Sequence, residues 1–437
     1  MVIPKCDKKC RFLKMILYKI PIDKSEQIFY NIKQVILMDR QILHVDVNNA
    51  FLSWTAVEKL NNGETVDIRN IPAIIGGDES KRRGVVLAKS NIAKQFGIKT
   101  GEPIYFARKK CNKLQVFMSD YSIYKKYSDK MYNILLDYTD IIERFSIDEC
   151  FMDLTKFIGK NEKILDKAKE ISARIKNELG FTVNIGISTN KVLAKMASDF
   201  QKPDKIHTLY KSEIKEKMWK LPISDLFMVG RRSLPKLNKL GIITIGDLAK
   251  SDYKQIVRMF GKFGKMIWEY SNGIDDSEVI NTPDKPKGIG HSITLPYDYS
   301  EIEKLEEVLL VLTEQVCFRL RKIEMVAKVV NVQIKNNKFE VSSHQRKLDV
   351  ATSSTRKIYE EAKKLLKELY KGIPIRLIGI RVDNLCMKNE MQLSMFDVEI
   401  DEKQEKLNKT LDSIKEKYGY EIISKAGELN IKRNFTN

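Results

Sequence analysis

The order of the segments between residues 42 and 187 constrains the fold more than any other feature of this chain. Apolar runs typical of strands alternate there with runs that have the periodicity of helices. We expect strands at residues 42–47, 141–145, 150–154 and 182–187, and helices at residues 50–60, 123–138 and 162–179. This order is the β-α-β-β-α-β pattern of a ferredoxin-like sheet, with a lysine-rich insertion at about residues 67–113 after the first helix. In such a sheet the first and third strands lie side by side at the centre.

A second β-α-β-β-α-β pattern follows the polar linker that ends at residue 287. Its strands are expected near residue 292 and at residues 326–334, 339–348 and 375–382, and its helices at residues 301–322 and 355–370. Ser300 and Glu303 are spaced for a capping box at the first of these helices. Between the two patterns, glycine-containing turns separate short helices. They predict either helix-hairpin-helix units, whose backbone N–H groups bind phosphate, or a plain helical subdomain.

Three acidic residues lie where strand-like apolar runs make a charge costly. Asp46 ends the run ILHVDV, and Asp148 and Glu149 are adjacent in RFSIDECFMDL. Carboxylates in such positions require a neutralising cation. If the first and third strands are neighbours, the three acids converge and supply the oxygen ligands that Mg²⁺ prefers. Two such ions are the arrangement used for in-line attack on a phosphate. The alternative for either segment alone is a salt-bridged structural acid.

Composition indicates a polyanionic partner. The 77 lysines and arginines exceed the 58 acids, so the net charge is 77 − 58 = +19. A membrane surface is the rival partner, but no stretch approaches the roughly 20 apolar residues of a spanning helix. The six cysteines show no spacing suited to zinc or to a disulfide framework, and the start of the chain shows no export signal. We therefore expect a cytoplasmic protein of about three or four domains.

Four blocks in order, HVDVNNAF, VLAKSNIAKQFGIKTGEP, FSIDECFMDL and NIGISTNKVLAKMASDFQKPD, resemble the DinB/UmuC group of bacterial Y-family DNA polymerases. The resemblance covers roughly residues 40 to 396. It implies an α+β multidomain protein with a ferredoxin-like palm, inserted fingers, a helix-hairpin-helix thumb and a second ferredoxin-like little-finger domain. The implied ranges are 38–52 and 113–209 for the palm, 53–112 for the fingers, 210–276 for the thumb, 277–287 for the linker, 288–386 for the little finger and 387–437 for the tail.

The resemblance also implies an activity and its site residues. The activity is template-directed, error-prone translesion synthesis from dNTPs on a primer–template, by a monomer that uses two Mg²⁺ ions. Asp46, Asp148 and Glu149 match the catalytic carboxylates, and Val47 matches the residue whose carbonyl completes a metal shell. Phe51 matches the steric gate against ribonucleotides, and a helix-core phenylalanine is its alternative role. The remaining matches are Lys94 and Lys202 on the triphosphate and the small residues Gly84 and Val85 over the nascent base pair.

The sequence departs from the family pattern at several of these positions. Asn91 stands where many relatives carry a triphosphate-binding tyrosine, and Lys94 replaces a commoner arginine, which turns a bidentate fork into a point charge. Asn48 stands where a second aspartate is frequent. These changes bear on nucleotide affinity and leave the three carboxylates in place.

A final motif lies in the tail. Gln392, Leu393, Met395 and Phe396 resemble the peptide with which bacterial proteins bind the sliding clamp, and the alternative is a tail that packs on its own little finger. Residues 1–37 match nothing in the family, and we expect them to be dispensable. Two rival functions remain: a non-catalytic DNA-binding repair factor, which loss of a carboxylate would favour, and a two-metal nuclease, which has no need of Phe51 or the triphosphate lysines.

Overall fold

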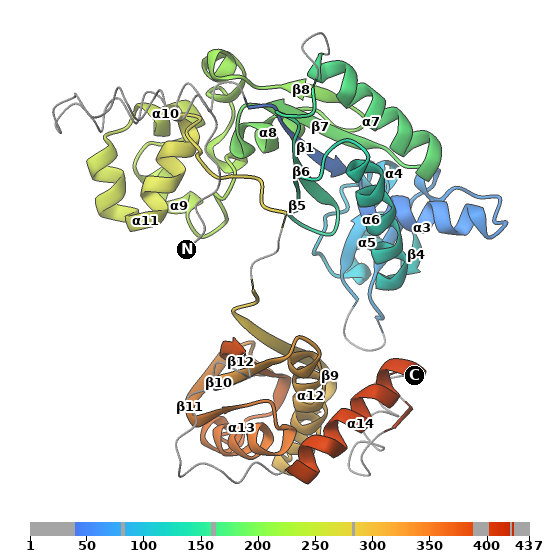
Figure 1. The fold of residues 1–437 in the computed structure, drawn as a ribbon, viewed down its shortest axis with the longest axis vertical. Coiled ribbons are helices and arrows are strands. Elements are labelled where there is room, and N and C mark those ends of the chain that lie inside the picture. Colours follow the sequence, from blue (N-terminus) through green and yellow to red (C-terminus); the bar gives the residue numbers. More distant parts are fainter. Residues whose placement is uncertain are drawn as a thin grey trace, which may run out of the picture. The chain divides into compact units, whose positions relative to one another are not determined.

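The computed structural model describes residues 40–79, 84–158, 163–281, 285–387, 402–419 and 422–423. The chain divides into two compact units, each with a hydrophobic core of its own (Figure 1). Residues 1–75, 86–100 and 107–283 form the first unit, and residues 76–85, 101–106 and 284–437 form the second. The proposed N-terminal extension and the clamp motif lie outside the described residues.

A five-stranded sheet is the centre of the first unit. Its order is β5-β6-β1-β7-β8, and its strands are β1 (Ile42–Val47), β5 (Ile142–Arg144), β6 (Glu149–Asp153), β7 (Val183–Ser188) and β8 (Ile206–Thr208). The first and third strands of the predicted pattern, β1 and β6, are antiparallel neighbours, as expected. Strand β8, which pairs in parallel with β7, extends the sheet beyond the prediction.

The two faces of this sheet are covered by different helices. Side chains alternate between the faces along each strand. Leu43, Val45 and Val47 of β1 face the core that contains α6 (Tyr121–Leu136) and α7 (Ile164–Leu179). Ile42 instead packs with Phe151 of β6 and with Ala194 of α8 (Lys191–Ser198), so the even-numbered residues of β1 lie on the α8 side.

Helix α8 was not predicted from the sequence. A glycine on β7 allows this helix to pack closely against the strand. A Cβ atom on Gly186 of β7 would lie only 1.9 Å from the carbonyl oxygen of Ala194. No larger residue fits there, so the backbone of α8 rests directly on the strand. The other side of α8 contributes Val192, Leu193, Met196 and Ala197 to the core of the helical segment that follows.

Helix α3 (Ala50–Asn61) crosses the predicted boundary between palm and fingers, and it follows Asn49 in the left-handed conformation (φ 51°). A three-stranded sheet of order β3-β2-β4 comes next: β2 (Ala73–Gly76) and β3 (Val86–Lys89) lie in the predicted fingers, and β4 (Gln115–Met118) lies in the predicted palm. The short helices are α4 (Asn91–Gln95), which Ser90 caps through the N–H of Ala93, and α5 (Ile104–Lys110).

The predicted thumb segment is entirely helical. Its α-helices are α9 (Leu234–Lys239), α10 (Ile245–Lys250) and α11 (Tyr253–Ser271). Thr244 and Asp247 form a capping box at the start of α10. One of the predicted glycine-containing turns falls at Gly261, where α11 kinks (φ 61°). Short 3₁₀ and π-helical turns between Lys211 and Asp225 precede these helices.

The second unit contains the predicted little finger. Four long strands, β9 (Gly288–Tyr299), β10 (Met325–Asn336), β11 (Val341–Thr352) and β12 (Ile375–Met387), form one antiparallel sheet with α12 (Ile302–Lys322) and α13 (Thr355–Leu369). The predicted element order is correct. The strand order is β11-β10-β12-β9, so the second and fourth strands are central here, whereas the first and third are central in the first sheet.

One detail of this unit differs from expectation. The capping box at Ser300 and Glu303 is wrong: α12 has Glu301 at its N-cap without a side-chain hydrogen bond, and the Ser300 carbonyl accepts a bond from Tyr370. The tail contains α14 (Glu402–Tyr418), which contacts α12 through a two-pronged pair between Arg321 and Asp412. None of the helices in the described part of the chain is both long and apolar enough to cross a bilayer.

Candidate active site

Asp46 and Glu149 are brought together by the register of the first sheet. Asp46 lies directly opposite Glu149 on β6 and opposite Asn184 on β7. Directly opposed residues of antiparallel strands have Cβ atoms about 5 Å apart on the same face. That face is the one covered by α8, and only 5 % of Asp46 is exposed. The two carboxylates therefore lie next to each other in a nearly buried position, and this pairing depends on the register between β1 and β6.

Asp148 lies beside this pair, but its carboxylate has a different partner. The Val47 N–H donates to the Asp148 carbonyl oxygen at 3.0 Å, which ties the end of β1 to the start of β6. The Asp148 carboxylate accepts a hydrogen bond from the Ser146 hydroxyl at 2.5 Å. Among the described residues no three acidic, histidine or cysteine side chains are arranged to hold a metal ion.

Two lysines supply the positive charge that the buried acids require. The Lys195 ammonium lies 2.6 Å from Glu149 Oε1 and 3.4 Å from Asp46 Oδ2. The Lys202 ammonium lies 2.6 Å from the same Asp46 oxygen and 2.8 Å from Asp199. Each ammonium group occupies a place where a cation is favoured, so the carboxylates fit a metal by their chemistry, although the present geometry pairs them with lysine.

The electrostatics of the cluster follow from burial and these contacts. Burial raises the pKa of Asp46, an effect that Lys202 and Lys195 oppose. Burial also acts to raise the pKa of Glu149, but the Lys195 ammonium at 2.6 Å opposes it, and that pKa is lowered to about 2. Burial would lower the pKa of Lys195, whereas Asp46 and Glu149 raise it above its usual value. Glu149 and Lys195 are therefore a charged pair at neutral pH.

His44 is fully buried on the same face and completes the cluster. Its Nδ1 lies 2.8 Å from the Ser198 hydroxyl, which itself donates to the Lys195 carbonyl oxygen at 2.7 Å. Ser198 must then accept from His44, so Nδ1 carries the proton in the neutral ring. Burial lowers the pKa of His44 and favours this neutral form. Its Nε2 lies 3.8 Å from Glu149 Oε2, too far for a hydrogen bond, and has no hydrogen-bond partner among the described residues.

A cavity of about 360 Å³ opens beside the acids. The residues that line it come from the end of β1, the start of α3, β3, α4, the loop after α4 and the position just before β6: Val47, Asn49, Ala50, Phe51, Leu87, Ala88, Lys89, Asn91, Lys94, Thr100 and Asp148. Asp148, Val47, Phe51 and Lys94, which the sequence singled out, thus share one cavity. Asn49 helps to define it, since its side-chain N–H donates to the Lys89 carbonyl oxygen at 2.5 Å.

The Phe51 ring is held by other aromatic rings. It stacks on Tyr124 with centroids 4.4 Å apart at 16°, and Tyr121 meets it edge-on at 5.9 Å. The residue is only partly buried, and it faces the cavity as well as the core. The two roles considered for Phe51, gate and core residue, are therefore compatible, because one ring face packs while the remainder limits the cavity.

Gly84 and Val85 lie in the segment between β2 and β3. The Gly84 carbonyl oxygen accepts from the Ile104 N–H at 2.9 Å, and Val85 pairs with Pro103 as an isolated bridge. Val85 is 40 % exposed. Their place over a nascent base pair stays a prediction.

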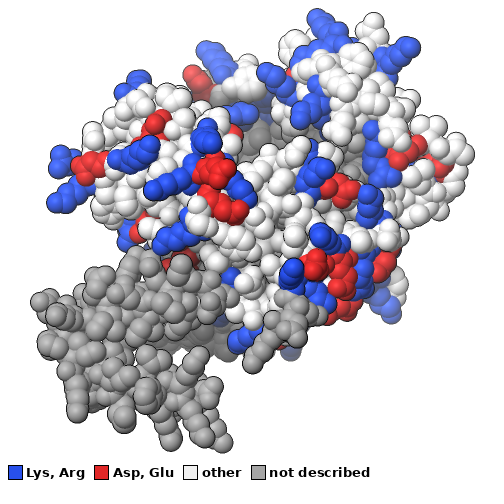
Figure 2. Space-filling view, turned by 90° about the horizontal axis from the view of Figure 1, so that it is seen from above, with Lys and Arg blue, Asp and Glu red and all other residues white. Residues whose placement is uncertain are grey.

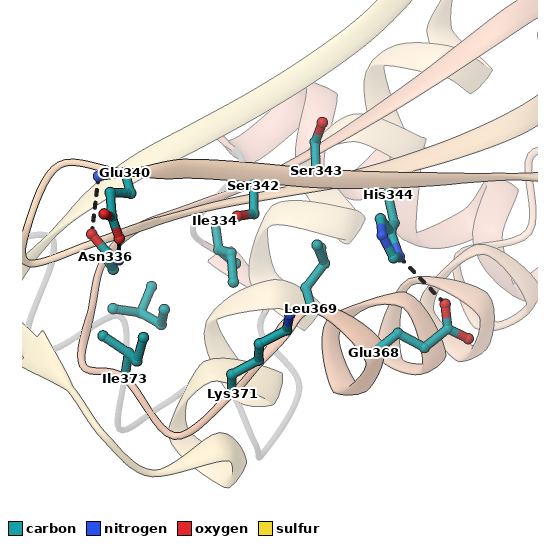
Figure 3. Close-up of a pocket in the computed structure, with 11 residues that line it drawn as sticks. Ile334, Asn336, Glu340, Ser342, Ser343, His344, Glu368, Leu369, Lys371 and Ile373 are labelled. Atoms are coloured by element: carbon teal, nitrogen blue, oxygen red, sulfur yellow. Dashed lines mark hydrogen bonds and ion pairs between the residues drawn. The ribbon is translucent and has the colours of Figure 1, made fainter.

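The second unit has a larger cavity, of about 510 Å³, at the turn end of the β10–β11 hairpin (Figure 3). Figure 3 shows His344 paired with Glu368 on one side and Asn336 with Glu340 on the other. Its floor is apolar, formed by residues such as Ile334 and Leu369. Size alone does not make it the catalytic site, because the buried, charge-compensated carboxylates lie at the other cavity.

The sequence reading missed Lys195, His44 and Ser198. A signal was present for Lys195, since it is the charged residue inside the buried run VLAKMAS, and a lysine there needs a partner. His44 lies two residues before Asp46 on β1, and the two side chains are therefore on the same face of the strand. Neither signal identifies the partner, because α8 is distant in sequence from β1 and β6.

Comparisons with known proteins identify the family of this chain. The family model described as the impB/mucB/samB family matches residues 45–199, its C-terminal domain matches residues 286–395, and the IMS family HHH motif matches residues 211–242. The DNA polymerase IV of Clostridium acetobutylicum is 51 % identical over 389 residues, which are 89 % of this chain and 98 % of that protein.

Two further relatives and one solved structure extend the comparison. The DNA polymerase IV of Acetivibrio thermocellus is 38 % identical over 88 % of this chain and 96 % of its own length, and DNA polymerase IV 2 of Bacillus subtilis is 36 % identical over 90 % and 95 %. A Y-family DNA polymerase chimera superposes with a TM-score of 0.70 at 23 % identity, over 79 % of this chain and 99 % of the other. The likeness at that identity concerns the fold.

Proposed function

The chain belongs to the impB/mucB/samB family of Y-family DNA polymerases, and from this premise we propose how its residues catalyse nucleotide addition. The enzyme is a DNA-directed DNA polymerase of the translesion type. One observation supports the location of its chemistry: Asp46 and Glu149 face each other across β1 and β6, beside the cavity that contains Phe51, Lys94 and Asp148.

Asp46, Asp148 and Glu149, with the Val47 carbonyl, would hold two Mg²⁺ ions. When bound, these ions neutralise charge on the reacting phosphate and promote attack by the primer 3′-hydroxyl. The carboxylates carry their own negative charge in a nearly buried site, where water screens that charge little. Glu149 is ionised at neutral pH, as its pKa of about 2 requires, and is ready to bind a cation.

The remaining site residues would bind and select the nucleotide. Lys94, in the cavity wall, and Lys202, on the exposed side of the acid cluster, would bind the triphosphate as point charges. Phe51 would exclude the ribose 2′-hydroxyl, because its ring is braced by Tyr124 and cannot easily withdraw. Gly84 and Val85 would cover the nascent base pair with little side-chain bulk.

The wider proposal concerns domains and partners. Residues 38–52 and 113–209 act as palm, 53–112 as fingers, 210–276 as thumb, 277–287 as linker and 288–386 as little finger, which together hold a primer–template as a monomer in the bacterial cytoplasm. The basic excess of +19 favours sequence-independent contact with phosphates. Residues 392–396 bind the sliding clamp.

Primer extension by purified variants tests the carboxylate assignment. Asp46→Asn and Asp148→Asn should each slow nucleotide addition by at least about 100-fold, because each removes a charge that stabilises the reacting phosphate. Binding to primer–template, measured by fluorescence anisotropy, should remain.

Asp153→Asn is the matched control. It lies on the same strand β6, pairs with Arg40 at 3.7 Å, and is far from the cavity. A near-normal extension rate for Asp46→Asn would overturn the assignment, as would an equal loss of rate in Asp153→Asn.

A further inference from the structure

Lys195 has a place in the acid cluster that binding of a triphosphate does not explain. Its ammonium joins the two opposed carboxylates, at 2.6 Å from Glu149 and 3.4 Å from Asp46, and also lies 3.4 Å from Asp199. The cluster has a second lysine, Lys202, that contacts the same Asp46 oxygen. The two lysines differ in how far they are free to move.

Packing holds Lys195 where it is. Its side chain is 10 % exposed, against 38 % for Lys202. The helix that bears it rests directly on β7 at Gly186, and its other side contributes Leu193 and Met196 to a hydrophobic core. Lys202 follows the helix in a loop and is able to turn toward solvent. A nucleotide can therefore draw Lys202 away from Asp46, whereas Lys195 stays beside the carboxylates.

The net charge of the acid cluster determines how strongly it attracts a divalent cation. The three acids that contact these lysines, Asp46, Glu149 and Asp199, carry three negative charges, and the two lysines carry two positive charges, so the cluster has 2 − 3 = −1. A permanent ammonium within a few ångströms of a bound divalent cation repels it, and burial limits screening by water. An incoming triphosphate adds negative charge and offsets that repulsion.

We propose that Lys195 is a built-in counter-ion that weakens divalent-metal binding in the nucleotide-free enzyme, so that the full metal complement assembles together with the triphosphate. This inference rests on the metal site proposed above. Lys195 is accordingly a positioning residue: it acts through Asp46 and Glu149 and does not touch the substrate. In the nucleotide-free state it also holds the two carboxylates in register.

Binding of Mn²⁺ to the full-length protein, followed by electron paramagnetic resonance without DNA or nucleotide, tests the proposal. Lys195→Met should bind Mn²⁺ at least tenfold more tightly than the wild type, because a positive charge next to the ion is lost. Lys195→Arg keeps the charge and should bind as the wild type does. Adding a non-hydrolysable dNTP should tighten Mn²⁺ binding in both proteins, because the triphosphate adds negative charge beside the ion.

Lys191→Met is the matched control. Lys191 lies on the same helix, is 15 % exposed and pairs with Glu143 at 2.7 Å, away from the acids. Its removal should leave Mn²⁺ affinity unchanged. Unchanged or weaker Mn²⁺ binding by Lys195→Met would overturn the proposal, and so would equal tightening in Lys191→Met.

Two further variants separate the possible failures. Lys195→Gln retains a donor for Glu149 without the charge, and it should also tighten Mn²⁺ binding if Lys195→Met fails to fold. Asp46→Asn should lose Mn²⁺ binding. If neither the wild type nor a neutral Lys195 variant binds Mn²⁺, or if Asp46→Asn binds it as tightly as the wild type does, the metal site itself is refuted. A normal wild type with no tightening in either neutral Lys195 variant refutes the counter-ion alone.

Discussion

Asp46 shows how two interpretations of a buried charge become one. The sequence predicted that an acid at the end of an apolar strand needs a cation, and left open a metal or a salt bridge. In the structure the carboxylate pairs with Lys195 and Lys202. A salt-bridged acid and a metal ligand are compatible at this position, because the same burial that demands a lysine also favours a divalent ion.

The proposed role of Phe51 in excluding ribonucleotides can be tested by removing its ring. Phe51→Ala should raise the incorporation of ribonucleotides relative to deoxyribonucleotides by 100-fold or more, about 3 kcal/mol of discrimination, since the ring would no longer fill the space of the 2′-hydroxyl. Steady-state incorporation of dNTP and rNTP opposite the same template base measures the ratio.

Phe157→Ala removes an aromatic ring of the same unit that is 45 % exposed, and it should leave sugar discrimination unchanged. If Phe51→Ala also leaves the ratio unchanged, Phe51 is only a core residue and another group selects the sugar.

At the scale of elements, the contact between α8 and β7 decides whether Lys195 reaches the acids. Gly186→Ala should lower the free energy of unfolding by about 1–3 kcal/mol, because its Cβ would overlap the Ala194 carbonyl oxygen and force the helix away. Chemical denaturation measures the change. Gly230→Ala is the control, since nothing lies within 4 Å of its Cβ. Equal stability of Gly186→Ala and the wild type would show that α8 can shift freely.

Helix α14 gives a second test at this scale. Arg321 donates to both oxygens of Asp412 at 2.5 and 2.9 Å, and it also binds the Ser353 carbonyl oxygen, so its guanidinium is already oriented for the pair. Asp412→Asn should weaken the docking of α14 by about 1–3 kcal/mol and speed backbone hydrogen exchange in that helix.

Glu416→Gln is the corresponding control for α14. Its pair with Lys322 is 3.3 Å long and both side chains are about half exposed, so little change in exchange is expected. Similar exchange in both variants would mean that apolar contacts, and not the buried pair, hold α14 in place.

The whole molecule carries a net charge of +19, and its proposed active site borders a cavity. On the face seen in Figure 2, lysine and arginine side chains are spread over the surface with acids among them, and they do not gather in one patch. Such a distribution suits weak, salt-sensitive contact along a duplex. Tethering to a clamp then offers high effective concentration without a change in the active site.

The proposed clamp motif at residues 392–396 can be tested by substitution. Changing Gln392, Leu393 and Phe396 together to alanine should abolish stimulation by a loaded clamp and leave clamp-free extension unchanged. Product length with and without clamp measures both. Ser394→Ala, at the variable position of the motif, should still be stimulated. Equal stimulation of the triple variant and the wild type would assign this tail another role.

The order of strands and helices in the two predicted sheets and the helical character of residues 210–276 could be predicted from the sequence, because both depend on local periodicity. The cost of burying a charge marked Asp46, Asp148 and Glu149 as acids that need a cation, and their role in catalysis stays a prediction. The sequence also predicted that β1 and β6 are neighbours, since the β-α-β-β-α-β order places those strands at the centre. The strand order of the little finger, the contact of α8 with β7 and the partners of Asp46 were decided by tertiary structure alone. Lys195 meets Glu149 only because a glycine lets a helix rest on a strand, and such contacts between distant segments leave no periodic signal in the chain.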